Sequence, residues 1–340
     1  MSQQPFPKVL HVDTSFAPDH ALTSEFWSAK IHYKDIAQVN PTWRKLEQRL
    51  RLDFSLALLA KRMAKDFDVL LVGSEKGGIP LAWLGVDKPI VTIVHQIITR
   101  PKRILVGTAQ AKWARVGTWA KADGDLMIEQ YGYPANHLFN YTSSPMDRFD
   151  PSENIDDGPM ISLGVAKRDY VTLVNALRGL PDHHSQIFVS SRYKDQFQGA
   201  LPEAVPAWVH LEPPVSEEGL IERYKHARFA VVPLVPGTPY SAGCTGIVEA
   251  GAAGKAVIAT RTRWTQDYVQ DGVTGILVPE GDSDAMRQAI QKLWDDPALA
   301  RRMGQANRRY MEARYSPAIV NEGIKQALLG AHLEHLRKKA

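Results

Sequence analysis

Short, continuous apolar runs recur through the first 142 residues, with longer stretches of mixed polarity between them. The runs predict β-strands at VLHVDT (9–14), FDVLLVG (67–73), KPIVTIVH (88–95), DLMIEQ (125–130) and HLFNYT (137–142). Because the apolar residues are consecutive rather than alternating, we expect a parallel sheet covered on both faces. Helical patterns fill the gaps, including the stretch between His20 and Pro41, so this half is predicted to be Rossmann-like.

A second series of strands follows SSPMDRFDPSENIDDGP at 143–159, a segment without periodicity that we interpret as an interdomain linker. Six further strands are predicted at PMISLGV, SQIFVSS, WVHLEP, RFAVVPL, KAVIAT and TGILVPE. The predicted fold class is therefore α/β, with Rossmann-like domains at 1–150 and 151–316 that share a cleft at the carboxyl ends of their sheets. A C-terminal helix at 317–340 is expected to pack back toward the first domain.

The stretch from Trp43 to Lys65 predicts a basic amphipathic helix. Its expected apolar side consists of Leu46, Leu50, Phe54, Leu58 and Leu59. Two interpretations stay open: a helix packed on the sheet with a solvated basic face, or a contact with an anionic membrane surface. A nucleic-acid partner is disfavoured, because aromatic residues other than Trp43 do not interleave with the basic run.

Composition sets outer limits on this picture. The chain has 340 residues, of which 44% are hydrophobic and 23% charged, as expected for a soluble protein of two domains. A single cysteine excludes an internal disulfide framework and fits a reducing cytoplasm. Neither a signal peptide nor a membrane span is predicted, so we expect a cytoplasmic protein, either free or peripheral to the inner face of the membrane. The net charge of +4 selects no partner by itself.

Residues 237–282 carry the strongest local signal for ligand binding. A small-residue loop, SAGCTG, leads into a short helix and then, after Gly254, into an apolar strand. Small residues let a ligand approach the backbone, and the free N–H groups at a helix start favour an anion. We therefore predict a phosphate-binding loop. Cys244 lies inside it, and we interpret it as a small lining residue rather than a nucleophile, because no histidine is close in sequence.

The same stretch resembles the C-terminal domain of retaining GT-B glycosyltransferases of family 4. The resemblance lies in a helical Glu249 followed by AGAAGKAVIAT and then by DGVTGILVPEGD. SLGVAKRDYVTLVNAL resembles the first strand, loop and helix of that domain, and YGYPANHLFNYTSSPMDRFDP resembles its approach to the linker. The resemblance implies a GT-B fold and metal-independent glycosyl transfer from a nucleotide-diphosphate sugar to an acceptor hydroxyl, with no separate cofactor. A UDP-sugar is expected ahead of a GDP-sugar, and the acceptor is a glycan, a lipid-linked sugar or a small molecule.

The resemblance also implies roles for particular residues. Glu249 would bind the ribose hydroxyls, and Arg168 would be catalytic by neutralising the diphosphate as it leaves. His95, at the end of a predicted strand, would be the second catalytic residue, near the donor sugar. The remaining donor-binding candidates are Gly164, Lys167, Arg192, Lys194, Tyr240, Ser241, Gly243, Cys244 and Thr245. A loop of Lys76, Gly77 and Gly78 is expected to meet donor or acceptor.

Two positions depart from the family pattern. Ser241 stands where a Glu is usual, and Val165 stands where an Arg is usual. Residues 242–245 and 260–267 are similar to a subgroup with a small-residue donor loop, which favours a working variant. A non-catalytic GT-B-like scaffold that binds sugar or polyanion is the alternative. The Asp123-Gly124-Asp125 run is predicted to precede a strand at its amino end, away from the ligand edge, so we predict no metal.

Overall fold

The computed structural model describes residues 6–14, 26–33, 36, 41–95, 97, 99–151, 158–164, 166–178, 180, 185–188, 198–200, 204, 206–212 and 216–340. The chain divides into two compact units. Unit 1 comprises residues 1–142 and 318–340, and unit 2 comprises residues 143–317. Unit 1 is therefore assembled from both ends of the chain, and each unit contains one parallel six-stranded sheet.

The sheet of unit 1 has the strand order β2-β1-β3-β4-β5-β6. Its strands are β1 (Val9–Asp13), β2 (Ala29–His32), β3 (Val69–Val72), β4 (Ile90–Val94), β5 (Trp113–Thr118) and β6 (Leu138–Asn140). Every pairing in this sheet is parallel, as the continuous apolar runs predict.

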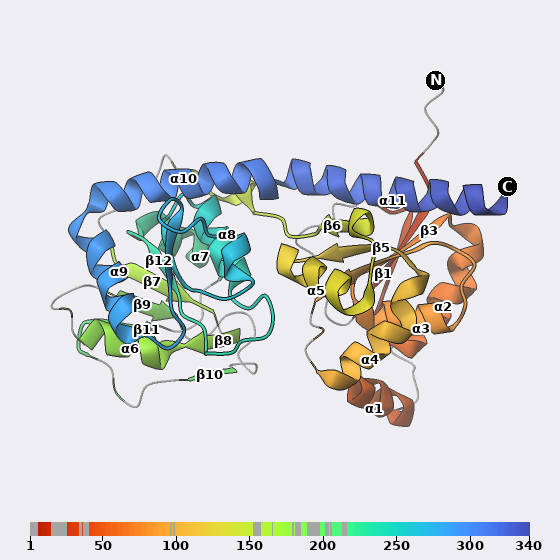
Figure 1. The fold of residues 1–340 in the computed structure, drawn as a ribbon, viewed down its shortest axis with the longest axis horizontal. Coiled ribbons are helices and arrows are strands. Elements are labelled where there is room, and N and C mark those ends of the chain that lie inside the picture. Colours follow the sequence, from red (N-terminus) through yellow and green to blue (C-terminus); the bar gives the residue numbers. More distant parts are fainter. Residues whose placement is uncertain are drawn as a thin grey trace, which may run out of the picture. The chain divides into compact units, whose positions relative to one another are not determined.

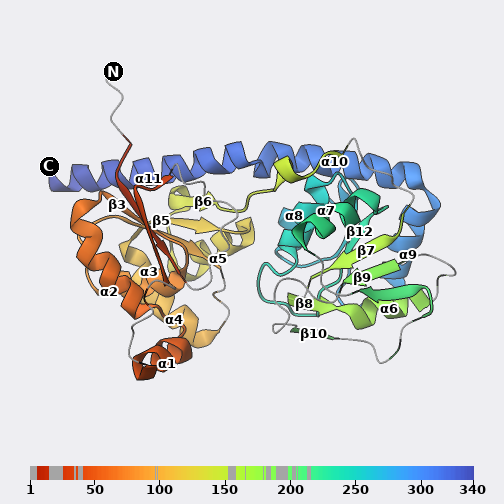
Figure 2. The same ribbon diagram turned by 180° about the vertical axis from the view of Figure 1, so that it is seen from behind.

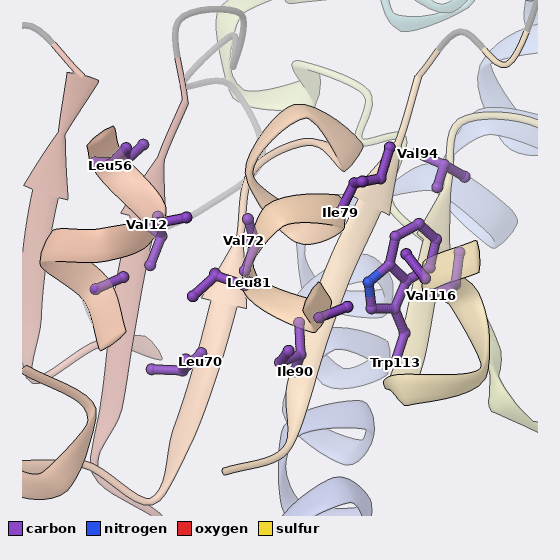
Figure 3. Packing of buried hydrophobic residues seen from close by; sticks show 14 of the residues in the cluster. Val12, Leu56, Leu70, Val72, Ile79, Leu81, Ile90, Val94, Trp113 and Val116 are labelled. Atoms are coloured by element: carbon purple, nitrogen blue, oxygen red, sulfur yellow. The ribbon is translucent and has the colours of Figure 1, made fainter. Parts of the chain in front are cut away.

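Helices cover both faces of this sheet (Figures 1 and 2). One face carries α2 (Phe54–Met63), α3 (Glu75–Trp83) and α4 (Arg100–Ala109). Figure 3 shows Leu56 of α2 and Ile79 and Leu81 of α3 among the apolar side chains of the strands. The other face is covered by α11 (Pro317–Lys339), whose residues Val320, Ile324 and Leu328 join a core with Val9 and Leu71. Successive strand residues thus pack alternately against the two helical layers.

Two stretches of unit 1 have another secondary structure than the sequence predicts. Residues 125–130 are not a strand but lie in helix α5 (Lys121–Tyr131), and the strand at this place in the sheet is β5, which the apolar pattern missed. The helix is favoured because Asp123 accepts a hydrogen bond from the N–H of Ala120, and Gly132 ends the helix in the left-handed conformation. Strand β2 likewise lies inside the stretch that was predicted to be helical.

The predicted basic amphipathic helix is two helices, α1 (Pro41–Leu50) and α2. The chain breaks between them at Arg51, which has a φ of 53°. The predicted apolar side is also partly wrong, because Leu46, Leu50 and Leu58 are exposed. The buried side consists instead of Leu52, Leu56, Ala57 and Ala60.

The sheet of unit 2 has the order β11-β9-β7-β12-β13-β14, and all its pairings are parallel. Its strands are β7 (Met160–Leu163), β9 (Ser185–Phe188), β11 (Val209–Glu212), β12 (Ala230–Val232), β13 (Val257–Thr260) and β14 (Gly275–Val278). All six coincide with predicted strands. A further pair, β8 (Ala166–Asp169) with β10 (Gln198–Ala200), forms a small separate sheet that was not predicted.

The helices of unit 2 cover the two faces of its sheet (Figure 1). Helices α6 (Tyr170–Arg178), α9 (Ser283–Asp295) and α10 (Pro297–Tyr315) contribute to one apolar core with β7, β13 and β14. Helix α8 (Cys244–Ala252) contacts β12, β13 and α10, and α7 (Glu217–His226) precedes β12. This arrangement brings the loop after β7 and the start of α8 to the same edge of the sheet, because parallel strands end together.

Candidate functional site

The first component of the site in unit 2 is the loop that follows β7. Gly164 has a φ of 114°, and a Cβ atom there would lie 2.3 Å from Nη2 of Arg168. The Arg168 guanidinium donates to the carbonyl of Leu163 over 2.9 Å and to that of Ala166 over 3.0 Å. Tyr170 donates to the Gly164 carbonyl over 2.7 Å. Arg168 is therefore a buried, fixed cation seated on a glycine.

The loop is also tied to the segment after β12. Asp169 N–H donates to the Pro233 carbonyl, and Val235 N–H donates to the Lys167 carbonyl, over 3.2 and 2.9 Å. Lys167 itself has a φ of 55°, which is uncommon for a residue with a side chain. These bonds hold the first loop against the chain that leads into α8.

The second component is the start of α8. Gly243 precedes the helix with a φ of 81°, and a Cβ there would lie 2.7 Å from Val232. Cys244 is buried and begins the helix, Thr245 is exposed, and Ser241 and Tyr240 are half-buried. The helix has nine residues, so its first-turn N–H groups and dipole can interact favourably with an anion.

These two components meet at Arg168. A Cβ on Gly243 would lie 3.4 Å from Nη1, and one on Gly246 would lie 3.5 Å from Nη2 of the same guanidinium. A buried tyrosine that sequence reasoning missed, Tyr224, donates to the Gly246 carbonyl over 3.2 Å. Burial, and then the nearby Glu249 carboxylate, raise the pKa of Tyr224 well above its ordinary value, and Arg168 offsets this in part. Arg168, the start of α8, Tyr224 and Glu249 are thus neighbours.

Tyr240 belongs to the same neighbourhood. Burial raises the pKa of its hydroxyl, and the positive charge of Arg168 lowers it in part. The predicted residues Gly164, Lys167, Arg168, Tyr240 and Gly243 are therefore brought together, along with the helix that carries Glu249. Arg192, Lys194 and Val165 lie outside the described residues.

The candidate residues of unit 1 lie at the carboxyl ends of β3 and β4. His95 follows β4 and is 7% exposed. Its Nε2 lies 2.8 Å from the Gly73 carbonyl, and its backbone N–H donates over 3.1 Å to the Glu75 carboxylate. Burial lowers the pKa of His95, and Glu75 opposes the shift. Burial therefore favours the neutral form of the imidazole.

Lys76, Gly77 and Gly78 do not form a loop, which corrects the prediction. They belong to the first turns of α3, which Ser74 caps by accepting from the N–H of Lys76 over 3.0 Å. A Cβ on Gly78 would lie 2.5 Å from Thr92 Oγ1, so this glycine permits close packing of helix on sheet. Lys76 is half-buried, and burial lowers its pKa.

Asp123 and Asp125 lie in the first two turns of α5 rather than before a strand. Asp125 pairs with Lys121 over 2.8 Å, and Asp123 caps the helix, so both have structural partners. In the part of the chain that the structure describes, no cluster of three or more His, Cys, Asp or Glu residues could hold a metal ion. Over the same residues, no helix combines the length and apolarity that crossing a bilayer requires.

Comparison with known proteins places a glycosyltransferase segment within unit 2. Residues 171–296 match the family model described as Glycosyl transferases group 1. The D-inositol 3-phosphate glycosyltransferase of Streptomyces avermitilis is 38% identical over 131 residues, which are 38% of this chain and 27% of that protein. The putative glycosyltransferase EpsD of Bacillus subtilis is 38% identical over 72 residues, 20% of this chain and 19% of that protein. The matched segments thus span about a quarter or less of these relatives.

Solved structures are similar over nearly the whole chain. Anabaena HepE, crystallised in complex with UDP-glucose, has a TM-score of 0.72 at 15% identity and covers 95% of this chain and 99% of its own. Sucrose-phosphate synthase from Thermosynechococcus elongatus has a TM-score of 0.70 at 18% identity and covers 98% of this chain and 89% of its own. The chain therefore has the fold of GT-B glycosyltransferases, two Rossmann-like domains with parallel sheets, and residues 171–296 of unit 2 match the Glycosyl transferases group 1 model.

Proposed function

We propose that the protein is a retaining, metal-independent glycosyltransferase of the family 4 type, which moves a sugar from a nucleotide-diphosphate sugar to an acceptor hydroxyl. The main support for this proposal is that the Arg168 guanidinium lies beside the start of α8. A fixed guanidinium and a helix N-terminus together suit a diphosphate. HepE was solved with UDP-glucose, which supports a UDP-sugar as the donor, with a GDP-sugar second.

The transfer step requires stabilisation of the departing diphosphate, whose negative charge increases as the glycosidic bond breaks. Arg168 is already immobilised by the carbonyls of Leu163 and Ala166, so it needs little reorganisation when that charge develops. In a retaining transfer of this type, a phosphate oxygen of the leaving group helps to take the proton of the acceptor. The protein then needs no second carboxylate of the kind that a glycosidase uses.

Glu249 would hold the ribose of the donor. Its carboxylate has two acceptor oxygens, which match two neighbouring hydroxyl donors. It lies in the second turn of α8, one turn beyond the proposed diphosphate position, and close to the buried hydroxyl of Tyr224. Ser241 is half-buried and would contribute through the backbone of its loop rather than through a carboxylate.

Unit 1 would contribute His95 toward the donor sugar and Lys76 toward donor or acceptor. The proposed acceptor is a glycan, a lipid-linked sugar or a small molecule. The name of the Streptomyces relative, an inositol phosphate glycosyltransferase, supports a small polar acceptor, and that of EpsD leaves the acceptor open.

We also propose an anionic membrane surface as a partner of α1 and α2. Leu46 and Leu50 lie one turn apart on α1 and are 41% and 44% exposed, and Leu58 on α2 is 41% exposed. The exposed charged residues between Arg44 and Arg62 are all basic: Arg44, Lys45, Arg49, Arg51, Lys61 and Arg62. The two acids of this stretch, Glu47 and Asp53, are buried. Exposed leucines flanked by cations suit a lipid interface.

A non-catalytic scaffold is the second candidate, and Ser241 in place of the usual acid is the observation that favours it. The two candidates differ in turnover. We expect the protein to release nucleotide from a UDP- or GDP-sugar, with water or a sugar as acceptor, and to do so in excess EDTA. Release that EDTA abolishes would contradict metal independence. Nucleotide binding without release from any donor, at any acceptor tested, would favour the scaffold.

The stereochemistry of the product tests retention separately. NMR of the product anomeric proton should show the configuration of the donor. A product with inverted anomeric configuration would contradict the retaining mechanism but not the proposed donor site.

A further inference from the structure

A buried ion pair joins α3 to α4 beside His95. Glu75 is the first residue of α3 and is 2% exposed, and Lys102 lies in the first turn of α4 and is 9% exposed. Glu75 Oε1 and Lys102 Nζ are 2.9 Å apart. Burying two charges is costly and is retained only where the geometry satisfies both groups. Nothing in the proposed donor site uses this pair directly.

The second oxygen of Glu75 reaches the end of the neighbouring strand. Oε2 accepts from the backbone N–H of His95 over 3.1 Å. The imidazole of His95 makes a second link between the same two chain ends, because its Nε2 lies 2.8 Å from the Gly73 carbonyl. A carbonyl can only accept, so Nε2 carries the proton in the neutral ring. Nδ1 is then the acceptor nitrogen of that ring.

We propose that the Glu75–Lys102 pair is a positioning device for His95, which holds the end of β4 and keeps the ring in the single tautomer and orientation that the transfer reaction needs. The substrate half of this inference rests on the glycosyltransferase function proposed above. The structural half, a fixed ring with a single tautomer, does not depend on it. Glu75 and Lys102 act through His95 and do not themselves need to touch substrate.

Among the described residues, the charged groups that act most strongly on His95 from the surrounding helices are Glu75 and Lys76 of α3 and Lys102 of α4. Burial lowers the pKa of His95, the Glu75 carboxylate raises it, and both lysines lower it. For Glu75, burial alone would raise the pKa, but Lys102 and the His95 contacts bring it below its ordinary value. The carboxylate therefore stays ionised, and the two members of the pair act on His95 in opposite directions.

Nitrogen-15 NMR of the histidine rings tests the structural half directly. The chain has 11 histidines, so the His95 signals are assigned by their loss in His95→Gln. The wild-type protein should show a protonated Nε2 and an unprotonated Nδ1 on His95 at neutral pH, with a pKa below that of an ordinary histidine. A protonated Nδ1, or a mixture of tautomers, would overturn the proposal.

Single variants of Glu75 and of Lys102 should shift the His95 pKa in opposite directions. Glu75→Gln should lower the His95 pKa further, because it removes an attractive charge and leaves Lys102. Lys102→Met should raise it. The double variant Glu75→Gln/Lys102→Met should have a His95 pKa between those of the two single variants. It should also fold better than either single variant, because it leaves neither member of the buried pair charged and unpaired. Shifts of the same sign, or no shift in folded variants, would contradict the assignment.

The exposed pair Asp87–Lys339 provides the control in the same unit, and Asp87→Asn/Lys339→Met should leave the His95 signals unchanged. If one single variant does not fold, the tautomer of the wild type and the sign of the His95 pKa shift in the other single variant still decide.

Kinetics test the substrate half. Glu75→Gln should lower kcat by roughly 10- to 100-fold, as expected for a displaced reacting group, with less effect on the donor KM. An unchanged kcat would mean that the reaction does not depend on the position of His95, even if the NMR experiments show the expected tautomer and pKa shifts. If instead no donor is turned over by the wild type, the proposed function fails and the NMR result stands by itself.

Discussion

At the scale of single residues, Arg168 shows what a sequence can and cannot convey. Its place after the first strand of unit 2 identifies it as a candidate anion ligand. Its burial, and the use of part of its guanidinium to bind the carbonyls of Leu163 and Ala166, depend on the path of the loop. Tyr224, Glu75 and Lys102 likewise lie in no recognisable sequence motif. Their connection to the candidate site residues is visible only from contacts between residues distant in the sequence.

Because the Arg168 guanidinium packs against Gly164, the substitution Gly164→Ala tests whether this contact fixes Arg168. The new Cβ would clash with the guanidinium at 2.3 Å, and a φ of 114° is strained for alanine. We expect a loss of about 2 to 4 kcal/mol in the free energy of unfolding, measured in urea, together with weaker nucleotide binding. Gly272→Ala is the matched control, since Gly272 has a φ of 77° and no atom within 4 Å of the added Cβ. Its cost should be only about 1 to 2 kcal/mol, and equal losses in both variants would refute the proposed seat.

At the scale of elements, the strands of unit 2 were predictable because each lies in a short apolar run, and every residue of β12 and β13 is buried. Strand β5 was not, because Arg115 interrupts its apolar pattern. Arg115 is buried there since Glu334 of α11 pairs with it, 219 residues away along the chain. For residues 125–130 the strand prediction was wrong although the apolar run is present. The capping interactions at Asp123 and Gly132 make this run helical.

Helices α1 and α2 carry a prediction of their own. If their exposed leucines and cations contact lipid, the protein should co-sediment with vesicles containing phosphatidylglycerol at low salt, and binding should fall as salt rises. Leu46→Ser/Leu50→Ser should reduce the bound fraction several-fold, because each exposed leucine contributes roughly 1 to 3 kcal/mol when buried in an apolar phase. Ile319→Ser, on the exposed surface of α11, is the control. Equal binding to neutral vesicles, or no binding at low salt, would exclude the anionic membrane as partner.

At the scale of the whole molecule, two Rossmann-like units followed from the alternation of strands and helices, whereas the order of the strands in each sheet depends on long-range packing. Residues 318–340 join residues 1–142 in unit 1. Helix α11 completes that unit by burying Val320, Ile324 and Leu328 against the face of the sheet opposite to α2 and α3. The donor candidates of unit 2 that the structure describes come from the loop at 164–168 and from residues 240–249, which include the first turns of α8, and both stretches were proposed from local motifs.

Unit 2 is proposed to bind a nucleotide diphosphate through Arg168, the start of α8 and Glu249. Calorimetric titration of UDP and of GDP into the wild-type protein, Glu249→Ala and the exposed-acid control Glu222→Ala tests it most directly. We predict that one of the nucleotides binds the wild type and the control equally. Binding to Glu249→Ala should be about 10- to 100-fold weaker, as expected for lost hydrogen bonds to a charged group. Failure of both nucleotides to bind the wild type, or an affinity that Glu249→Ala leaves unchanged, would contradict the account.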